Sequence, residues 1–189
     1  MDNTVAIVGA SGWLGRAVMA RIPQAIAVPA GDVLVDGAAA ALGAAVCAQQ
    51  RPNLTVVNLA GLKSGPMADM QRINAELVAD LAQVTAGLNA GLVHLGSAAE
   101  YGLQPDVEWI SGETAYQPSS DYGRTKHAGT NAALLNPRAV VLRPINIAAR
   151  PPQPGSPLED VLGRIRRGAP PDHQVELLSP NTRRDFVSL

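Results

Sequence analysis

A glycine-rich stretch near the N-terminus constrains the fold more than any other part of this sequence. Val5 to Val8 are four apolar residues in a row, and glycines follow at positions 9, 12 and 15. Four consecutive apolar residues suit a strand that is covered on both faces, as in a parallel sheet. Gly9 permits a tight turn, Gly12 lets backbone N–H groups approach a pyrophosphate, and Gly15 lets a helix pack against the sheet. The stretch predicts a strand, a phosphate-binding turn and a helix, although GxxGxxG spacing by itself also fits a turn without a ligand.

Apolar strands and helical patterns alternate along the rest of the chain. Strands are expected at residues 5–8, 25–28, 54–59, 92–95 and 139–142, with helices at 13–22, 38–50, 67–88 and 121–135. This alternation predicts an α/β fold with a doubly wound, Rossmann-type parallel sheet. A proline cluster after residue 150 is the best candidate for a boundary. We therefore expect a dinucleotide-binding domain over residues 1–150 and the start of a small substrate-binding lobe over 151–189, which contains a short helix at 158–167.

The composition excludes several classes of protein. The chain has 189 residues, a net charge of -1 and 3% aromatic residues, so it has neither the basic field nor the stacking side chains of a nucleic-acid binder. No apolar run reaches the ~18 residues that a membrane span needs. No basic region precedes an apolar one at the N-terminus. We therefore expect a soluble, cytoplasmic protein with no nucleic-acid or membrane partner.

Metal-binding patterns are missing from the sequence. Cys47 is the only cysteine, and the three histidines are scattered, so no metal-ligand spacing is formed. His94 lies within a predicted strand and is expected to be a packed core residue. The function must come from other side chains.

The residues after the second predicted strand bear on the choice of cofactor. In dinucleotide-binding folds an acidic residue about 20 positions beyond the glycines often holds the adenosine ribose. Here the strand ends at Pro29, and the nearest acids are Asp32 and Asp36. Arg16 stands where it can meet a 2′-phosphate, or it is simply an exposed helix residue. Both NAD and NADP stay open, with NADP favoured.

The strand predicted at 54–59 runs into Leu59, Ala60 and Gly61. Small residues at the carboxyl end of such a strand leave room for a flat ligand, at the edge where open α/β sheets bind ligands. This turn is therefore a second candidate contact for the dinucleotide.

Ser97, Tyr122 and Lys126 are the candidate catalytic residues. Tyr122 and Lys126 are four positions apart on a predicted helix and so share one face. A free tyrosine has a pKa near ~10, and we expect the lysine ammonium to lower it by favouring the phenolate. Ser97 follows a predicted strand and is placed to hydrogen-bond a substrate hydroxyl or carbonyl. These are the parts needed to move a proton while a nicotinamide moves a hydride.

Together these motifs resemble the extended short-chain dehydrogenase/reductase superfamily, and within it the NAD-dependent epimerase/dehydratase type that acts on nucleotide sugars. The resemblance covers essentially the whole chain. It rests on Gly9-x-x-Gly12-x-x-Gly15, Asn58-x-Ala60-Gly61, Ser97-Ala98-Ala99-Glu100-Tyr101-Gly102, Tyr122-x-x-x-Lys126, Arg143-Pro144-x-Asn146 and Arg184-Asp185-Phe186.

The resemblance implies a role for each matching residue. Tyr122 is the acid/base, Lys126 also binds the nicotinamide ribose, and Ser97 positions the sugar. Members of this superfamily often form homodimers through paired helices, here those at 67–88 and 121–135. The residues expected at the cofactor are Gly9, Ser11, Gly12, Trp13, Leu14, Gly15, Asp32, Asp36, Leu59, Ala60, Gly61, Tyr122, Lys126 and Pro144. Those expected at the substrate and its diphosphate are Ser97, Ala98, Tyr122, Asn146 and Arg184.

Two departures from the family pattern narrow the expected chemistry. Ala98 and Ala99 stand where the 4,6-dehydratases place an Asp-Glu pair, so dehydration is disfavoured because alanine transfers no proton. The sequence from Gly96 to Gly102 resembles the corresponding motif of the reductases for GDP-4-keto-6-deoxymannose. This resemblance favours reduction of a 4-keto-6-deoxy sugar. A nucleotide-sugar 4-epimerase with bound NAD is the alternative. Family members also continue past the Arg-Asp-Phe segment, so most of the substrate lobe is expected to be missing, and a non-catalytic dinucleotide-binding regulatory protein is a third possibility.

Overall fold

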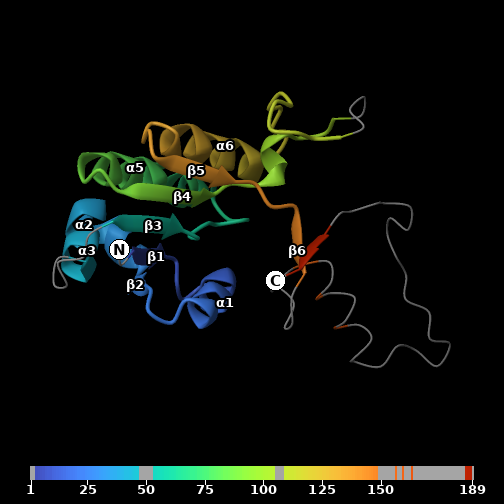
Figure 1. Cartoon of the computed structure of the whole chain (residues 1–189). Coiled ribbons are helices and arrows are strands. Elements are labelled where there is room, and N and C mark those ends of the chain that lie inside the picture. The colour runs from blue at the N-terminus through green and yellow to red at the C-terminus, as the bar shows by residue number, and fades with distance from the viewer. Residues whose placement is uncertain are drawn as a thin grey trace. The chain divides into compact units, whose positions relative to one another are not determined.

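Five parallel strands form the central sheet of the protein, whose structure is a computed structural model (Figure 1). The structure describes residues 3–46, 53–104, 109–148, 156, 159, 163 and 186–188. The strands are β1 (Thr4–Val8), β2 (Ile26–Val28), β3 (Leu54–Asn58), β4 (Gly91–Leu95) and β5 (Ala139–Leu142), in the order β2-β1-β3-β4-β5. All five predicted strands are confirmed to within one residue at each end. Because β2 and β3 lie on opposite sides of β1, the carboxyl ends of β1 and β3 form a topological switch point, where such sheets bind ligands.

Helices connect the strands. They are α1 (Trp13–Arg21), α2 (Ala30–Asp36), α3 (Ala38–Val46), α4 (Met67–Gln71), α5 (Leu77–Gly87) and α6 (Asp121–Ala133). A π-helical turn, η2 (Arg72–Glu76), joins α4 to α5, so the helix predicted at 67–88 is continuous but contains this irregular turn. Among the described helices, none combines the length and the apolar composition that a membrane crossing requires.

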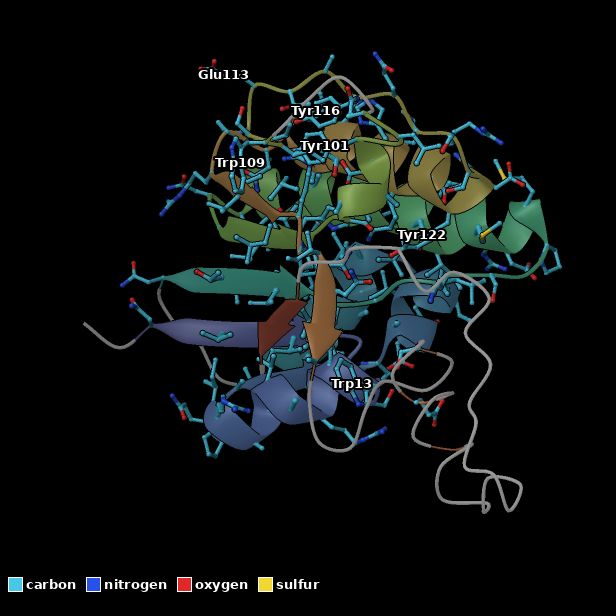
Figure 2. The ribbon with its side chains drawn as sticks, turned by 90° about the vertical axis from the view of Figure 1, so that its right-hand side faces the viewer. Trp13, Tyr101, Trp109, Glu113, Tyr116 and Tyr122 are labelled. Atoms are coloured by element: carbon cyan, nitrogen blue, oxygen red, sulfur yellow. The ribbon has the colours of Figure 1, made fainter. Side chains whose placement is uncertain are left out.

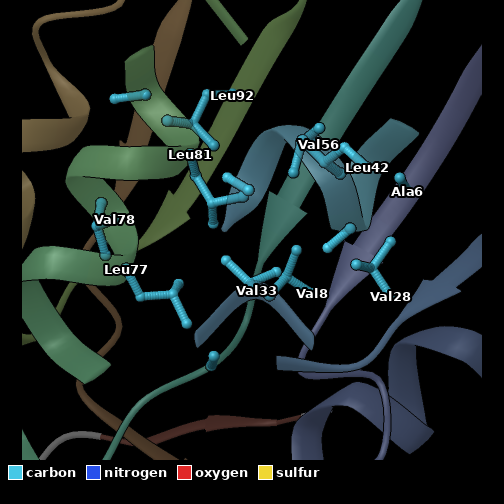
Figure 3. Packing of buried hydrophobic residues seen from close by; sticks show 14 of the residues in the cluster. Ala6, Val8, Val28, Val33, Leu42, Val56, Leu77, Val78, Leu81 and Leu92 are labelled. Carbon is cyan, nitrogen blue, oxygen red and sulfur yellow. The ribbon is translucent and has the colours of Figure 1, made fainter. Parts of the chain in front are cut away.

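The main hydrophobic core lies between the sheet and helices α2, α3 and α5 (Figure 3). Ala6 and Val8 of β1 belong to it, together with Val56 of β3 and Leu92 of β4. Side chains alternate along a strand, so the fully buried Ile7 points to the opposite face. Helix α1 packs on β1 and lies apart from α3, α5 and α6 (Figure 1). Helices therefore cover both faces of the sheet, so the sheet is doubly wound, as predicted.

Helix α2 was not expected from the sequence. The sequence predicted only that the strand ends at Pro29, yet a helix begins directly after this residue. Proline is well suited to a helix start, because its fixed φ is helical and it lacks an N–H that would have no partner there. Val33 on α2 is 1% exposed and joins the core. Burial of this one apolar side chain stabilises a helix whose local composition favours a turn.

The chain divides into two compact units, Met1–Arg143 and Pro144–Leu189. In the second unit, β6 (Asn146–Ala148) and β7 (Phe186–Ser188) form a parallel pair that the sequence analysis did not predict. Asn146 pairs with Phe186 in this register. The helix predicted at 158–167 lies almost wholly outside the described residues.

Candidate active site

The glycine-rich turn after β1 packs directly against the turn after β3. Gly9 has a φ of 83°, a conformation that favours glycine, and a Cβ there would lie 2.7 Å from the backbone nitrogen of Ala60. A Cβ at Gly15 would lie 2.1 Å from the carbonyl oxygen of Gly9. The backbone nitrogen of Leu59 donates to the carbonyl oxygen of Val8 at 2.9 Å. The structure therefore brings the two predicted cofactor turns together at the switch point.

Helix α1 begins at the end of this turn. Trp13 and Leu14 are half-buried in its first turn, and its N-cap residue, Gly12, supplies no side-chain cap. The first N–H groups of a helix have no intrahelical partner, and together with the helix dipole they favour an anion. Ser11 is exposed, and its carbonyl oxygen accepts a hydrogen bond from the Arg16 guanidinium. This arrangement fits the pyrophosphate of a dinucleotide.

The two acids proposed for the adenosine ribose lie on α2. Asp32 is in its first turn and Asp36 is its last residue, and both are exposed. Together with Ala27, Pro29 and alanines of α3 they line a hollow on the surface. A contact of either carboxylate with a ribose stays a prediction.

Ser97 stands just beyond the end of β4 as the N-cap of a short 3₁₀ turn, η3 (Ala98–Glu100). Its hydroxyl oxygen accepts a hydrogen bond from the backbone nitrogen of Ala99 at 3.2 Å. In return, the Glu100 carboxylate accepts one from the backbone nitrogen of Ser97 at 2.7 Å. This reciprocal pair is a capping box, and it holds Ser97 at the carboxyl edge of the sheet.

Tyr122 lies in the first turn of α6, next to Ser97. Helix α6 is capped by Ser120, whose hydroxyl accepts a hydrogen bond from Gly123 N at 3.0 Å. Burial raises the pKa of Tyr122, a hydrogen bond from the Ser97 side chain lowers it, and the charge of Glu100 raises it further, with a net increase. The expected lowering of this pKa by Lys126 is therefore wrong for this state of the protein. The desolvation of the phenolate outweighs the hydrogen bond from Ser97.

Lys126 is 3% exposed, and its ammonium donates to the carbonyl oxygen of Leu95 at 2.5 Å. Burial lowers the pKa of Lys126 to about 8, while the negative charge of Glu100 raises it. A Cβ at Gly61 would lie 3.8 Å from the lysine nitrogen. The structure thus places the amine between the end of β4 and the turn after β3, where the predicted nicotinamide ribose would bind.

Asn74 is a site residue that the sequence analysis missed. It lies in the π-helical turn and is fully buried. Its Oδ1 accepts a hydrogen bond from the backbone nitrogen of Leu62, and its Nδ2 donates one to the carbonyl oxygen of Leu62, both at 2.8 Å. Its amide also donates to Oγ1 of Thr125, the residue before Lys126, at 3.0 Å. One side chain thereby ties the turn after β3 to α6. An asparagine inside an apolar helix pattern was the available signal, because asparagine is a poor helix former unless its amide has partners.

His94 is confirmed as a buried core residue. It is fully buried in β4, and its Nδ1 lies 3.2 Å from the amide nitrogen of Asn58 on β3. Asn58 Oδ1 accepts a hydrogen bond from Ala60 N at 3.1 Å, so the amide nitrogen donates to Nδ1 and the ring proton is on Nε2. Burial first, then the charges of Lys126 and Arg143, lower the pKa of His94 to about 3. The neutral ring thus orients Asn58 and, through it, the turn after β3.

His94 is expected to make the fold less stable in acid. The unfolded chain takes up a proton near pH 6.5, whereas folded His94 does so only near pH 3, so stability is lost as the pH falls through this window. Each pH unit within it costs up to about 1.4 kcal/mol. Urea unfolding at pH 7 and at pH 5 measures the effect, and His94→Asn should remove this part of the pH dependence. An unchanged pH dependence in the variant would contradict the assignment.

Three predicted contact residues belong to the C-terminal part of the chain. Pro144 and Asn146 lie in the second unit, and Asn146 opens β6. Arg184 lies outside the described residues. Their contacts with cofactor or substrate stay predictions.

Comparison with known proteins adds a family to this geometry. Residues 5–189 match the model of the NAD dependent epimerase/dehydratase family. A curated relative, dTDP-6-deoxy-L-talose 4-dehydrogenase (NAD(P)(+)) from Kitasatospora kifunensis, is 32% identical over 212 aligned residues. The alignment covers 98% of this chain and 66% of the relative. The chain thus spans just under two thirds of that protein's length.

Solved structures share the fold. Bordetella bronchiseptica WbmG in complex with NAD superposes with a TM-score of 0.78 at 21% identity, covering 100% of this chain and 66% of WbmG. The dTDP-4-dehydrorhamnose reductase of Bacillus anthracis str. Ames in complex with NADP has a TM-score of 0.66 at 20% identity, covering 88% and 61%. At these identities the likeness establishes the Rossmann-type fold alone.

Proposed function

Because this chain belongs to the NAD dependent epimerase/dehydratase family, we propose that it acts as an NAD(P)-dependent reductase of a nucleotide-linked 4-keto-6-deoxy sugar. The observation that carries the proposal is the juxtaposition of Ser97, Tyr122 and Lys126 at the carboxyl edge of the sheet, beside the two glycine-containing turns. The names of the relatives support the substrate class, since one is a 4-dehydrogenase of a dTDP-6-deoxy sugar and another a dTDP-4-dehydrorhamnose reductase.

The chain's own residues supply the proton side of this chemistry. A bound dinucleotide contributes the hydride that reduces the ketone carbon. Ser97 hydrogen-bonds the ketone oxygen, and the Tyr122 phenol donates its proton to that oxygen as the alcohol forms. Solvent then returns a proton to the Tyr122 phenolate, while the Lys126 ammonium holds the nicotinamide ribose, as the family resemblance implies.

A protonated Tyr122 is the form that ketone reduction requires. Its raised pKa keeps the phenol protonated at neutral pH, which suits a proton donor. The alternative, a 4-epimerase, uses the same tyrosine first as a base and then as an acid, so turnover with a sugar panel separates the two reactions. Dehydration is disfavoured, because Ala98 and Ala99 hold no acid or base.

For the cofactor we propose NADPH. β2 is followed by Pro29, so no carboxylate directly after the strand repels a 2′-phosphate. The exposed Arg16 guanidinium lies at the rim of the glycine turn and is available as a cation for that phosphate. The homodimer expected from the family resemblance likewise stays a prediction.

Turnover with a sugar panel tests the proposal directly. Purified protein is mixed with NADPH or NADH and a series of nucleotide-linked 4-keto-6-deoxy sugars, and cofactor oxidation is followed by absorbance. We expect oxidation with at least one of these sugars, faster with NADPH than with NADH. Interconversion of 4-hydroxy sugars without added cofactor would instead favour the epimerase. Calorimetric binding of a dinucleotide with no turnover of any sugar would favour a regulatory protein.

A further inference from the structure

The buried carboxylate that caps Ser97 also contacts groups outside the capping box. Glu100 ends the short 3₁₀ turn η3 and is 0% exposed. Its two oxygens have different partners: one accepts from the backbone nitrogen of Ser97 at 2.7 Å, and the other from Nε of Arg143 at 3.0 Å. The Nδ1 atom of His127 lies 3.9 Å from the second oxygen. Glu100 therefore joins the end of β4, the end of β5 and helix α6.

The surroundings of Glu100 are shaped to hold a carboxylate. A Cβ at position 96 would lie 2.5 Å from its Oε1 atom and 3.1 Å from Cγ of Arg143, so only glycine leaves room for the side chain there. The guanidinium carbon of Arg143 lies 4.9 Å from the ring centroid of Tyr116 and 5.9 Å from that of Tyr101. The two rings stack on each other, with centroids 5.1 Å apart (Figure 2). Aromatic rings thus line the cation while Glu100 neutralises it.

A buried ion pair of this kind is weak evidence for a purely stabilising role. Removing two charges from water costs several kcal/mol per ion, and the attraction between them often does no more than offset that cost. The field of Glu100, however, also reaches the catalytic residues. The Lys126 ammonium is held at the carbonyl oxygen of Leu95, two residues before the Ser97 nitrogen that the Glu100 carboxylate binds. From there the charge of Glu100 raises the pKa of Lys126 against the effect of burial, and it contributes to the raised pKa of Tyr122. The charge therefore favours the protonated form of both groups.

We propose that Glu100 is a positioning residue of the active site: its buried carboxylate holds Ser97 beside Tyr122 and provides the countercharge for the buried ammonium of Lys126. This inference rests on the proposed roles of the three catalytic residues. Without the carboxylate, Lys126 loses its proton more readily and becomes a weaker donor to the predicted nicotinamide ribose. The charged and titratable groups that face Glu100 or its immediate partners are Arg143 at the end of β5, His127 and Lys126 on α6, His94 on β4, Tyr101 after η3, and Tyr116 in the loop before α6.

The composition of the chain makes the titration of Lys126 directly measurable. The sequence contains only two lysines, Lys63 and Lys126, so carbon-13 labelling of lysine gives two NMR signals. Lys63 is exposed and serves as an internal reference. Glu100→Gln keeps an oxygen that can accept from the Ser97 N–H but removes the charge. We expect the Lys126 titration midpoint to shift to lower pH in this variant, while the Lys63 signal titrates as in the wild type.

Glu113→Gln is the matched control, because this substitution also removes one carboxylate charge, but from an exposed residue in the loop before α6 (Figure 2). It should leave the Lys126 midpoint unchanged. If Glu100→Gln alone does not fold, Glu100→Gln combined with Arg143→Gln removes the ion pair without leaving a lone cation, and a smaller shift in the same direction is expected because the two lost charges oppose each other. A Lys126 midpoint that is unchanged or raised in a folded variant would overturn the inference.

A second substitution separates the effect of the hydrogen bond between Ser97 and Glu100 from the effect of the Glu100 charge. Glu100→Leu removes both the charge and the acceptor for Ser97, so it should lower turnover at least about tenfold below Glu100→Gln, since Ser97 then loses its fixed place. A Glu100→Leu protein as active as Glu100→Gln would overturn the positioning of Ser97. The lysine titration needs no substrate, so its failure is distinct from a failure of the proposed reductase activity, which the sugar panel reports by itself.

Discussion

Replacing Tyr122 with phenylalanine is expected to lower the rate of ketone reduction by about 100- to 10,000-fold. The substitution removes the only group that we place to donate a proton to the substrate oxygen, while the ring that packs in the half-buried site is kept. Single-turnover oxidation of NADPH with a reactive 4-keto sugar measures the loss. Calorimetric titration should show an almost unchanged affinity for the dinucleotide, because the phosphate-binding turn is untouched.

Tyr116→Phe is the matched control for this loss. It also removes one phenolic hydroxyl, but Tyr116 lies in the loop before α6, where its ring stacks on Tyr101 and is tilted against His127. Reduction by this variant should stay within about threefold of the wild type. A comparable loss in both variants, or a Tyr122→Phe enzyme with wild-type rates, would exclude Tyr122 as the acid.

Gly15→Ala is expected to weaken dinucleotide binding by about 100-fold or more, equivalent to about 2.8 kcal/mol. The added Cβ would lie 2.1 Å from the Gly9 carbonyl oxygen and 2.7 Å from backbone atoms of Ala10, so α1 must move away from the turn. This displaces the N–H groups that we assign to the pyrophosphate. Overpacking of this kind also costs about 1–3 kcal/mol of folding stability. Calorimetry with NADP and urea unfolding measure the two effects.

Gly43→Ala provides the opposite control. Gly43 lies inside α3, and a Cβ there would meet nothing within 4 Å. Alanine at such a helical position should stabilise the protein by about 0.5–1 kcal/mol and leave cofactor binding unchanged. If Gly15→Ala bound the dinucleotide as tightly as Gly43→Ala, the phosphate site would have to be placed elsewhere.

The strands were predictable because their signal is local. A parallel strand buried on both faces needs a short run of apolar residues, and those runs are visible at β1, β3 and β4. The glycine turn was predictable for the same reason, since its spacing is the geometry of one strand-to-helix connection. Helix α2 was not, because its formation depends on the burial of Val33 against strands that are distant in sequence.

The sequence by itself determined the succession of the five sheet strands along the chain and the identity of the candidate catalytic residues, because residue type and spacing specify both. Only the tertiary structure decided the pKa values, the burial and the hydrogen-bond partners of those residues. The pKa of Tyr122 rises instead of falling, Asn74 links the turn after β3 to α6, and Glu100 becomes a buried partner of Ser97 and Arg143. These outcomes depend on burial and on partners up to 51 positions apart. No local pattern encodes them, because the cost of desolvating a charge is set by the elements that fold around it.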